Sequence, residues 1–178
     1  MTRTKPLSLL LAFAAIALVA LVVAGCGGGG GDNQATASSG GSNAAGGSST
    51  IGLSKIGGLG RVLVDSQGRT VYLFEKDTGP KSTCFGACAT EWPPVTTSGK
   101  PSAGSGVTAS MLGTTKRSDG KTQVTYNGHP LYLFEADQKP GDATGQKVDA
   151  FGAEWYVLSP AGNKVAGKAT GSGGGYAY

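Results

Sequence analysis

Two cysteines four positions apart are the residues of this sequence best suited to chemistry. Cys84 and Cys88 stand as an isolated pair, because the third cysteine, Cys26, follows an apolar N-terminal segment. In a helical turn this spacing places the two Cα atoms about 6 Å apart, within the range of a disulfide. Outside the cytoplasm a lone pair favours a structural disulfide, and the alternative is a redox-active or metal-binding thiol pair.

Aspartates form the second candidate group. Asp77 and Asp137 each follow an apolar stretch by three residues, and we expect each carboxylate to accept hydrogen bonds from loop amides and close a turn. The alternative is calcium, because Asp137, Asp142 and Asp149 fall in one glycine-containing loop. The EF-hand spacing is missing and the loop after Asp77 lacks the extra acids, so we expect no cofactor.

Glu75 and Glu135 also occupy repeated positions and could be imagined as an acid–base pair. Each adjoins a phenylalanine at a strand end, where a solvated carboxylate is the simpler interpretation. The single histidine, His129, stands in an Asn-Gly-His-Pro turn, 41 positions beyond Cys88. We therefore assign no catalytic residue.

These residues belong to a duplicated segment. The run YLFEKD at 72–77 returns as YLFEAD at 132–137, and FGA at 85–87 returns as FGA at 151–153. Each FGA segment is followed by Glu-Trp, ending at Trp92 in the first copy and Trp155 in the second. Two copies predict a duplication with pseudo-twofold packing, because an open solenoid needs at least three units.

Each copy has the pattern of β-structure. Short β-branched or aromatic runs are separated by turn residues, and Asn127-Gly128 tolerates the positive φ angles of a tight hairpin turn. The expected strands are 61–65, 70–75, 123–126, 131–134, 155–158 and 163–165, with short helical turns at 85–92 and 109–112. The fold class is all-β or mainly β: two hairpin-containing repeats packed as one pseudo-twofold domain, with only short helical turns.

A six-residue signature, Tyr-x-[Phe/Trp/Tyr]-x-x-Asp, occurs in both copies. Its residues are Tyr72, Phe74 and Asp77 in the first and Tyr132, Phe134 and Asp137 in the second. With Cys84-x-x-x-Cys88, EWPP at 91–94 and YNG-x-PLY at 126–132, the chain resembles the bacterial secreted-repeat lipoproteins of unknown function. The resemblance implies a lipid-anchored or secreted envelope protein with two β-rich repeats. It brings no catalytic residues with it.

The N-terminus is typical of a lipoprotein signal. Arg3 and Lys5 precede an apolar run at 7–23, which is short for a bilayer span and ends in Val-Ala-Gly-Cys. We expect residues 1–25 to be a signal peptide and Cys26 to carry the lipid, with diacylglyceryl and palmitate chains. Residues 26–49 then form a flexible Gly/Ser linker, 50–169 the duplicated β-domain (repeats 57–97 and 117–162), and 170–178 a disordered tail.

The net charge of the chain gives no indication of nucleic-acid binding. The formal charge of +4 falls to +2 without Arg3 and Lys5, 13 basic residues against 11 acidic ones, and no basic run points to nucleic acid. The sequence predicts an extracytoplasmic module on the bacterial cell membrane that binds or scaffolds an envelope protein or ligand without catalysis. The alternatives are a redox or metal-handling protein using Cys84 and Cys88, and a hydrolase using paired carboxylates.

Overall fold

The structure is a computed structural model that describes residues 47–170. These residues fall within one compact unit, 41–178. The expected signal peptide, the lipidated Cys26 with most of the linker, and the tail after residue 170 lie outside the described residues. The elements are β1 (Thr50–Ile56), β2 (Gly60–Asp65), β3 (Tyr72–Phe74), α1 (Ala87–Glu91), β4 (Ser102–Ala103), the 3-10 helix η1 (Ala109–Met111), β5 (Leu112–Lys116), β6 (Thr122–Tyr126), β7 (His129–Pro130), β8 (Asp149–Ala150) and β9 (Ala153–Val157).

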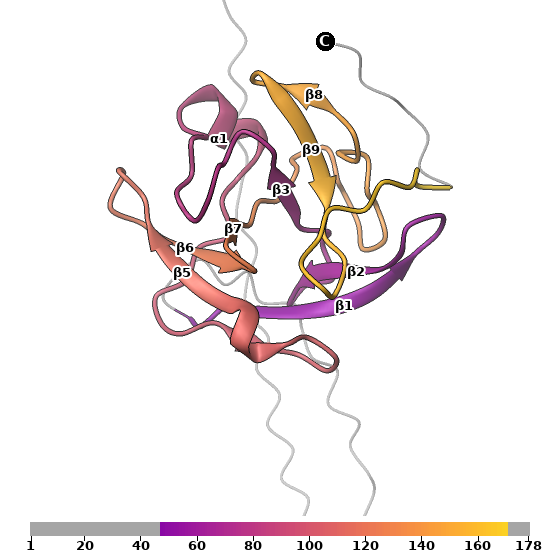
Figure 1. Cartoon of the computed structure of the whole chain (residues 1–178), viewed down its shortest axis with the longest axis horizontal. Coiled ribbons are helices and arrows are strands. Elements are labelled where there is room, and N and C mark those ends of the chain that lie inside the picture. Colours follow the sequence, from indigo (N-terminus) through magenta and orange to yellow (C-terminus); the bar gives the residue numbers. More distant parts are fainter. Residues whose placement is uncertain (1–46, 171–178) are drawn as a thin grey trace, which may run out of the picture. The chain divides into compact units, whose positions relative to one another are not determined.

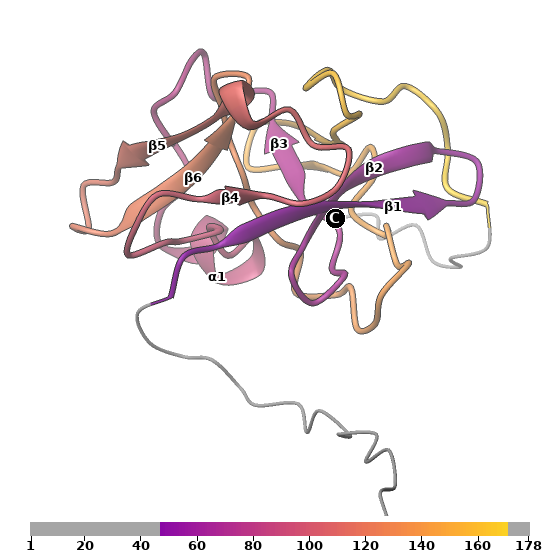
Figure 2. The same ribbon diagram turned by 90° about the horizontal axis from the view of Figure 1, so that it is seen from below.

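Three small sheets make up the domain. Their strand orders are β2-β1-β4, β3-β9-β8 and β5-β6-β7, and Figure 1 shows β1 and β2 below β3 and β9. In the first sheet β1 and β2 form an antiparallel hairpin and β4 runs parallel to β1, an arrangement visible from below in Figure 2. The predicted mainly-β class with two short helical turns is confirmed.

The two repeats exchange strands instead of folding side by side. β3 of the first repeat pairs with β9 of the second, where Phe74 faces Trp155, and Glu75 N donates to Glu154 O at 3.1 Å. The equivalent residues of the other copy pair in reverse: Glu135 N donates to Glu91 O at 3.0 Å. Each signature strand is therefore hydrogen-bonded to the tryptophan-bearing segment of the opposite repeat.

The pseudo-twofold axis passes between the two signature tyrosines. Tyr72 N donates to Tyr132 O at 2.8 Å, and Tyr132 N donates to Tyr72 O at 3.0 Å. Side chains at 72–74 are buried on both faces of the strand, which is typical of a central strand. The axis places equivalent groups of the two repeats in one core.

The predicted hairpin turn is also confirmed, with a difference in strand length. Asn127 and Gly128 have φ angles of 48° and 81°, and Tyr126 pairs with His129 across this two-residue loop. The ladder strand β7 covers only His129–Pro130, whereas we expected a strand over 131–134. Residues 131–133 do form β-type backbone hydrogen bonds, but each amide has a different partner segment. Leu131 N donates to Val124 O, Tyr132 N to Tyr72 O and Leu133 N to Pro93 O, so no continuous ladder forms.

Candidate functional site

The tyrosine and aspartate of the signature pair across the repeats. Tyr72 Oη donates to Asp137 Oδ2, and Tyr132 Oη donates to Asp77 Oδ2, each at 2.5 Å. Both tyrosines are fully buried, and the aspartates are 5% and 9% exposed. We call these two reciprocal bonds the Tyr–Asp clasp. Each carboxylate therefore does more than close its own loop, because it also fixes the opposite repeat.

The second oxygen of each aspartate does close a loop, as predicted. Asp77 Oδ1 accepts bonds from Thr83 N and Thr83 Oγ1, both at 2.7 Å. Asp137 Oδ1 accepts the same pair from Thr144, at 2.9 and 2.6 Å. The sequence signal for this loop is a threonine six or seven residues after each aspartate. The sequence analysis did not use it, because threonine is not among the usual metal ligands.

Burial and charge act together on the clasp tyrosines. Burial, and after it the negative charge of Asp137, raises the pKa of Tyr72 well above its usual value. Burial and Asp77 likewise raise the pKa of Tyr132. Both phenols therefore stay protonated at neutral pH. Because they donate to carboxylates, their hydrogen bonds are charge-assisted and strong.

Four aromatic rings form a continuous stack beside the clasp. The order is Phe74, Trp155, Trp92, Phe134, with ring centroids 4.0, 3.9 and 4.2 Å apart. The repeats alternate along it, so each tryptophan lies between two rings that both come from the other copy. Gly145 closes one side, because a Cβ there would lie 2.7 Å from Trp92 Cη2. All four rings belong to one buried hydrophobic cluster.

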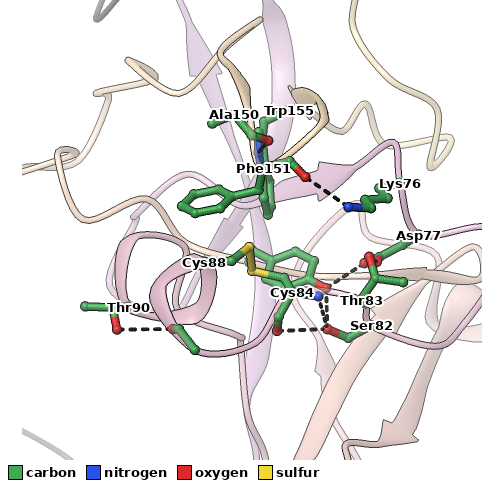
Figure 3. The surroundings of a disulfide bond; sticks show 12 residues. Lys76, Asp77, Ser82, Thr83, Cys84, Cys88, Thr90, Ala150, Phe151 and Trp155 are labelled. Atoms are coloured by element: carbon green, nitrogen blue, oxygen red, sulfur yellow. Dashed lines mark hydrogen bonds between the residues drawn. A yellow bond between two sulfur atoms is a disulfide. The ribbon is translucent and has the colours of Figure 1, made fainter. Parts of the chain in front are cut away.

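Cys84 and Cys88 form a disulfide with a Cα–Cα distance of 5.3 Å. It cross-links the turn in which α1 begins. The first repeat has three more residues here, between FGA and Glu-Trp, than the second repeat. Figure 3 shows Asp77, Ser82 and Thr83 gathered beside Cys84. Ser82 Oγ accepts from Cys84 N at 3.2 Å and lies 2.7 Å from Tyr132 Oη, so the disulfide loop connects directly to the clasp. The two cysteines are 0% and 6% exposed.

A buried arginine, which the sequence analysis missed, holds the disulfide loop from the other side. Arg117 is 5% exposed, and its guanidinium donates to Ser82 Oγ, Gln123 Oε1 and Cys84 O at 2.7–2.8 Å. In the second repeat, the carbonyl equivalent to that of Cys84 accepts Trp155 Nε1 at 3.2 Å. Since Arg117 takes the first-repeat carbonyl, Trp92 Nε1 is buried without a hydrogen-bond partner among the described residues. Arg117 lies outside the repeated motifs, so no pattern marked it.

The remaining acidic candidates are placed apart from one another. Asp142 Oδ2 accepts the backbone amides of Gln138 and Lys139, and Asp149 is exposed on β8. Within residues 47–170, no group of three His, Cys, Asp or Glu side chains is arranged to hold a metal ion. Asp137, Asp142 and Asp149, the residues of the calcium alternative, do not form such a group.

Glu75, Glu135 and His129 do not form a catalytic arrangement. Glu75 is bonded to Lys164 at the surface, Glu135 is exposed, and His129 is half-buried in β7. The expectation that both glutamates are solvent-facing holds.

The outer surface carries two features that the sequence did not indicate. One is a polar groove of about 560 Å³, which is defined by sixteen residues: Gly47, Ser48, Ser49, Thr50, Asp65, Ser66, Gln67, Arg69, Pro94, Val95, Thr96, Thr97, Ser98, Lys121, Thr122 and Leu133. The other is a pair of exposed phenylalanines, Phe85 and Phe151, each 38% exposed and each the first residue of an FGA segment. The Phe85 ring lies 4.5 Å from the Arg117 guanidinium.

Comparison with known families identifies the repeats. The family described as "Secreted repeat of unknown function" matches residues 55–96 and 113–159, half of the chain. These ranges contain both signatures, both tryptophans and the disulfide. Within residues 47–170 no helix is long and apolar enough to cross a membrane. Neither the comparison with curated proteins nor that with solved structures gives a significant match. The chain belongs to the family of secreted repeats of unknown function, and it is an extracellular module with two β-rich repeats.

Proposed function

We propose that this protein is a lipid-anchored cell-envelope module that binds or scaffolds at the outer face of the membrane without catalysis. The family supports the extracellular location. The anchor is supported by the sequence, in which Val-Ala-Gly precedes Cys26 and a Gly/Ser-rich linker follows it. We propose that this linker holds the domain clear of the lipid headgroups, because a flexible chain of about 23 residues has a root-mean-square reach of about 26 Å.

The Tyr–Asp clasp is the observation that carries the proposal. A signature that served catalysis would present its polar atoms to a substrate, whereas these phenols and carboxylates are buried and bonded to one another. The family signature therefore serves to lock two repeats into one rigid core. A rigid core of this kind is the usual support for binding surfaces made by loops.

The redox alternative gains little support from the disulfide. Thiol–disulfide exchange requires in-line attack on an accessible sulfur atom, and Cys84 and Cys88 are 0% and 6% exposed. The pair instead connects α1 to the Tyr–Asp clasp, because the Cys84 amide is hydrogen-bonded to Ser82 Oγ. These contacts support the interpretation that the disulfide is structural.

The test of anchorage is metabolic labelling of the full-length chain with radioactive palmitate in a bacterial host. The wild type is expected to incorporate label, Cys26→Ser to incorporate none, and the matched control Cys84→Ser/Cys88→Ser to label as the wild type does. Protease added to intact spheroplasts should degrade the labelled protein, because the domain faces outward. Unlabelled wild type, or full protection from protease, would contradict the proposal.

A further inference from the structure

We propose that the polar groove binds a saccharide that carries carboxylate groups. This inference rests on the proposed function, because it supplies the ligand class of the envelope module. The groove volume of about 560 Å³ lies within the range of roughly 300–1,000 Å³ typical of small-molecule sites. Its lining combines two cations with hydroxyl and amide groups, and its apolar residues are Pro94, Val95 and Leu133.

Arg69 is the group that would recognise the carboxylate. Asp65 Oδ2 accepts from Arg69 Nε at 2.8 Å and lies 2.7 Å from Nη2, so one edge of the guanidinium is held in place. Asp65 is itself fixed, because its Oδ1 accepts the amides of Gln67 and Arg69 at 2.9 Å. The Arg69 side chain is still 44% exposed, which leaves Nη1 donors for a ligand. A guanidinium positioned before binding loses little entropy on forming a bidentate pair.

Lys121 provides a second positive charge on the groove lining. Its side chain is exposed, and its own backbone amide is bonded to Asp119 Oδ1 at 3.1 Å. The lining has two basic side chains, Arg69 and Lys121, and one carboxylate, Asp65, which is paired with Arg69. Asp119, whose Oδ1 accepts the Lys121 amide, lies beside this lining. The formal charge of the lining residues is +1, which favours an anionic ligand, with Arg69 offering paired donors and Lys121 a second positive contact.

The hydroxyl groups of the groove suit the rest of a sugar chain. Ser66, Gln67, Thr96 and Ser98 are exposed lining residues, and hydroxyl and amide groups both donate to and accept from sugar hydroxyls. One wall is ordered by Ser49, whose Oγ donates to Thr96 O at 2.6 Å. That wall is the last part of the linker before β1, so the groove opens where the tethered chain enters the domain.

The experiment is a titration of the full-length, lipidated protein in detergent micelles, with ¹⁵N labelling and NMR detection of the Arg69 Nε–H signal. The probes are tetragalacturonate, neutral maltotetraose and glycerol 3-phosphate. Tetragalacturonate is expected to shift the Arg69 signal in a saturable way and to bind at least about tenfold more tightly than either other probe.

Variants separate the groove from general charge. Lys121→Gln should weaken tetragalacturonate binding about tenfold, and Arg69→Gln at least as much. Lys139→Gln is the matched control, because Lys139 is exposed and lies outside the groove lining; it should leave binding unchanged. Lys121→Gln leaves the Asp65–Arg69 pair intact and so remains informative if Arg69→Gln perturbs the turn.

Three results would overturn the inference: no saturable shift with tetragalacturonate, equal binding of glycerol 3-phosphate, or equal weakening by Lys139→Gln. The second result would show that any anion suffices, and the third that the effect is not local. None of these results affects palmitate labelling at Cys26, so the proposed anchorage can stand when the groove assignment fails.

Discussion

Removing one phenol oxygen tests whether the repeats are locked by the Tyr–Asp clasp. In Tyr132→Phe the ring keeps its packing, but Asp77 Oδ2 loses its 2.5 Å donor while it remains 5% exposed. A hydrogen bond to a charged group contributes about 1.5–3 kcal/mol to stability. The free energy of unfolding should fall by that amount, and by a similar amount in Tyr72→Phe, which removes the equivalent donor to Asp137.

Double-mutant cycles in urea then identify the partner of each tyrosine. Tyr132→Phe combined with Asp77→Asn should show a coupling energy of about 1 kcal/mol or more, because the two side chains are bonded across the repeats. The matched control combines Tyr132→Phe with Asp137→Asn, within a single signature. Those two changes should be additive within about 0.5 kcal/mol, since Asp137 bonds to Tyr72 instead. Coupling within a signature and additivity across the repeats would refute the exchanged arrangement.

Three further predictions concern the core and its disulfide. Phe134→Ala removes an end of the ring stack, 4.2 Å from Trp92, and should lower the free energy of unfolding by about 3–5 kcal/mol; an unchanged urea midpoint would contradict the buried placement. The pKa values of Tyr72 and Tyr132 are raised in the folded state, so their contribution is complete below pH about 10 and is lost as the pH rises above it. Urea midpoints should fall between pH 9 and pH 11, and less steeply in the double Tyr→Phe variant; equal slopes would argue against this cause. Because both cysteines are buried, the disulfide should have a reduction potential below about −300 mV when it is equilibrated with glutathione buffers. A value near −200 mV would revive the redox alternative.

The duplication and the local β-structure could be predicted because their signals are short-range. Strand alternation, the Asn127-Gly128 turn and the four-residue cysteine spacing each depend on neighbouring residues. The strands at 50–56 and 112–116 were missed, since each contains an interior glycine, which weakens a strand, and a lysine near or at its end. Pairing with β2 and with β6 stabilises them, and pairing partners are a property of the tertiary structure.

The clasp partners and the groove could not be predicted for a related reason. Each signature contains its own tyrosine and aspartate, and the sequence does not say whether Tyr72 bonds to Asp77 or to Asp137. The groove joins the linker end, the turn after β2, the segments near residues 96 and 121, and Leu133. Periodicity describes one element at a time, so a site assembled from five separate segments leaves no repeated spacing to detect.

The exchange of strands has an evolutionary consequence. Each repeat leaves its signature strand without its antiparallel partner, and Oδ2 of its aspartate without a donor, until the other copy supplies them. A protein with a single such repeat would therefore be complete only as a symmetric homodimer, with the two clasps formed between subunits. The present chain corresponds to that dimer joined by the segment between residues 97 and 112. Fusion makes the association of the two copies independent of protein concentration. It also allows the α1 insertion with its disulfide to occur in one copy only, whereas a symmetric dimer would carry it twice.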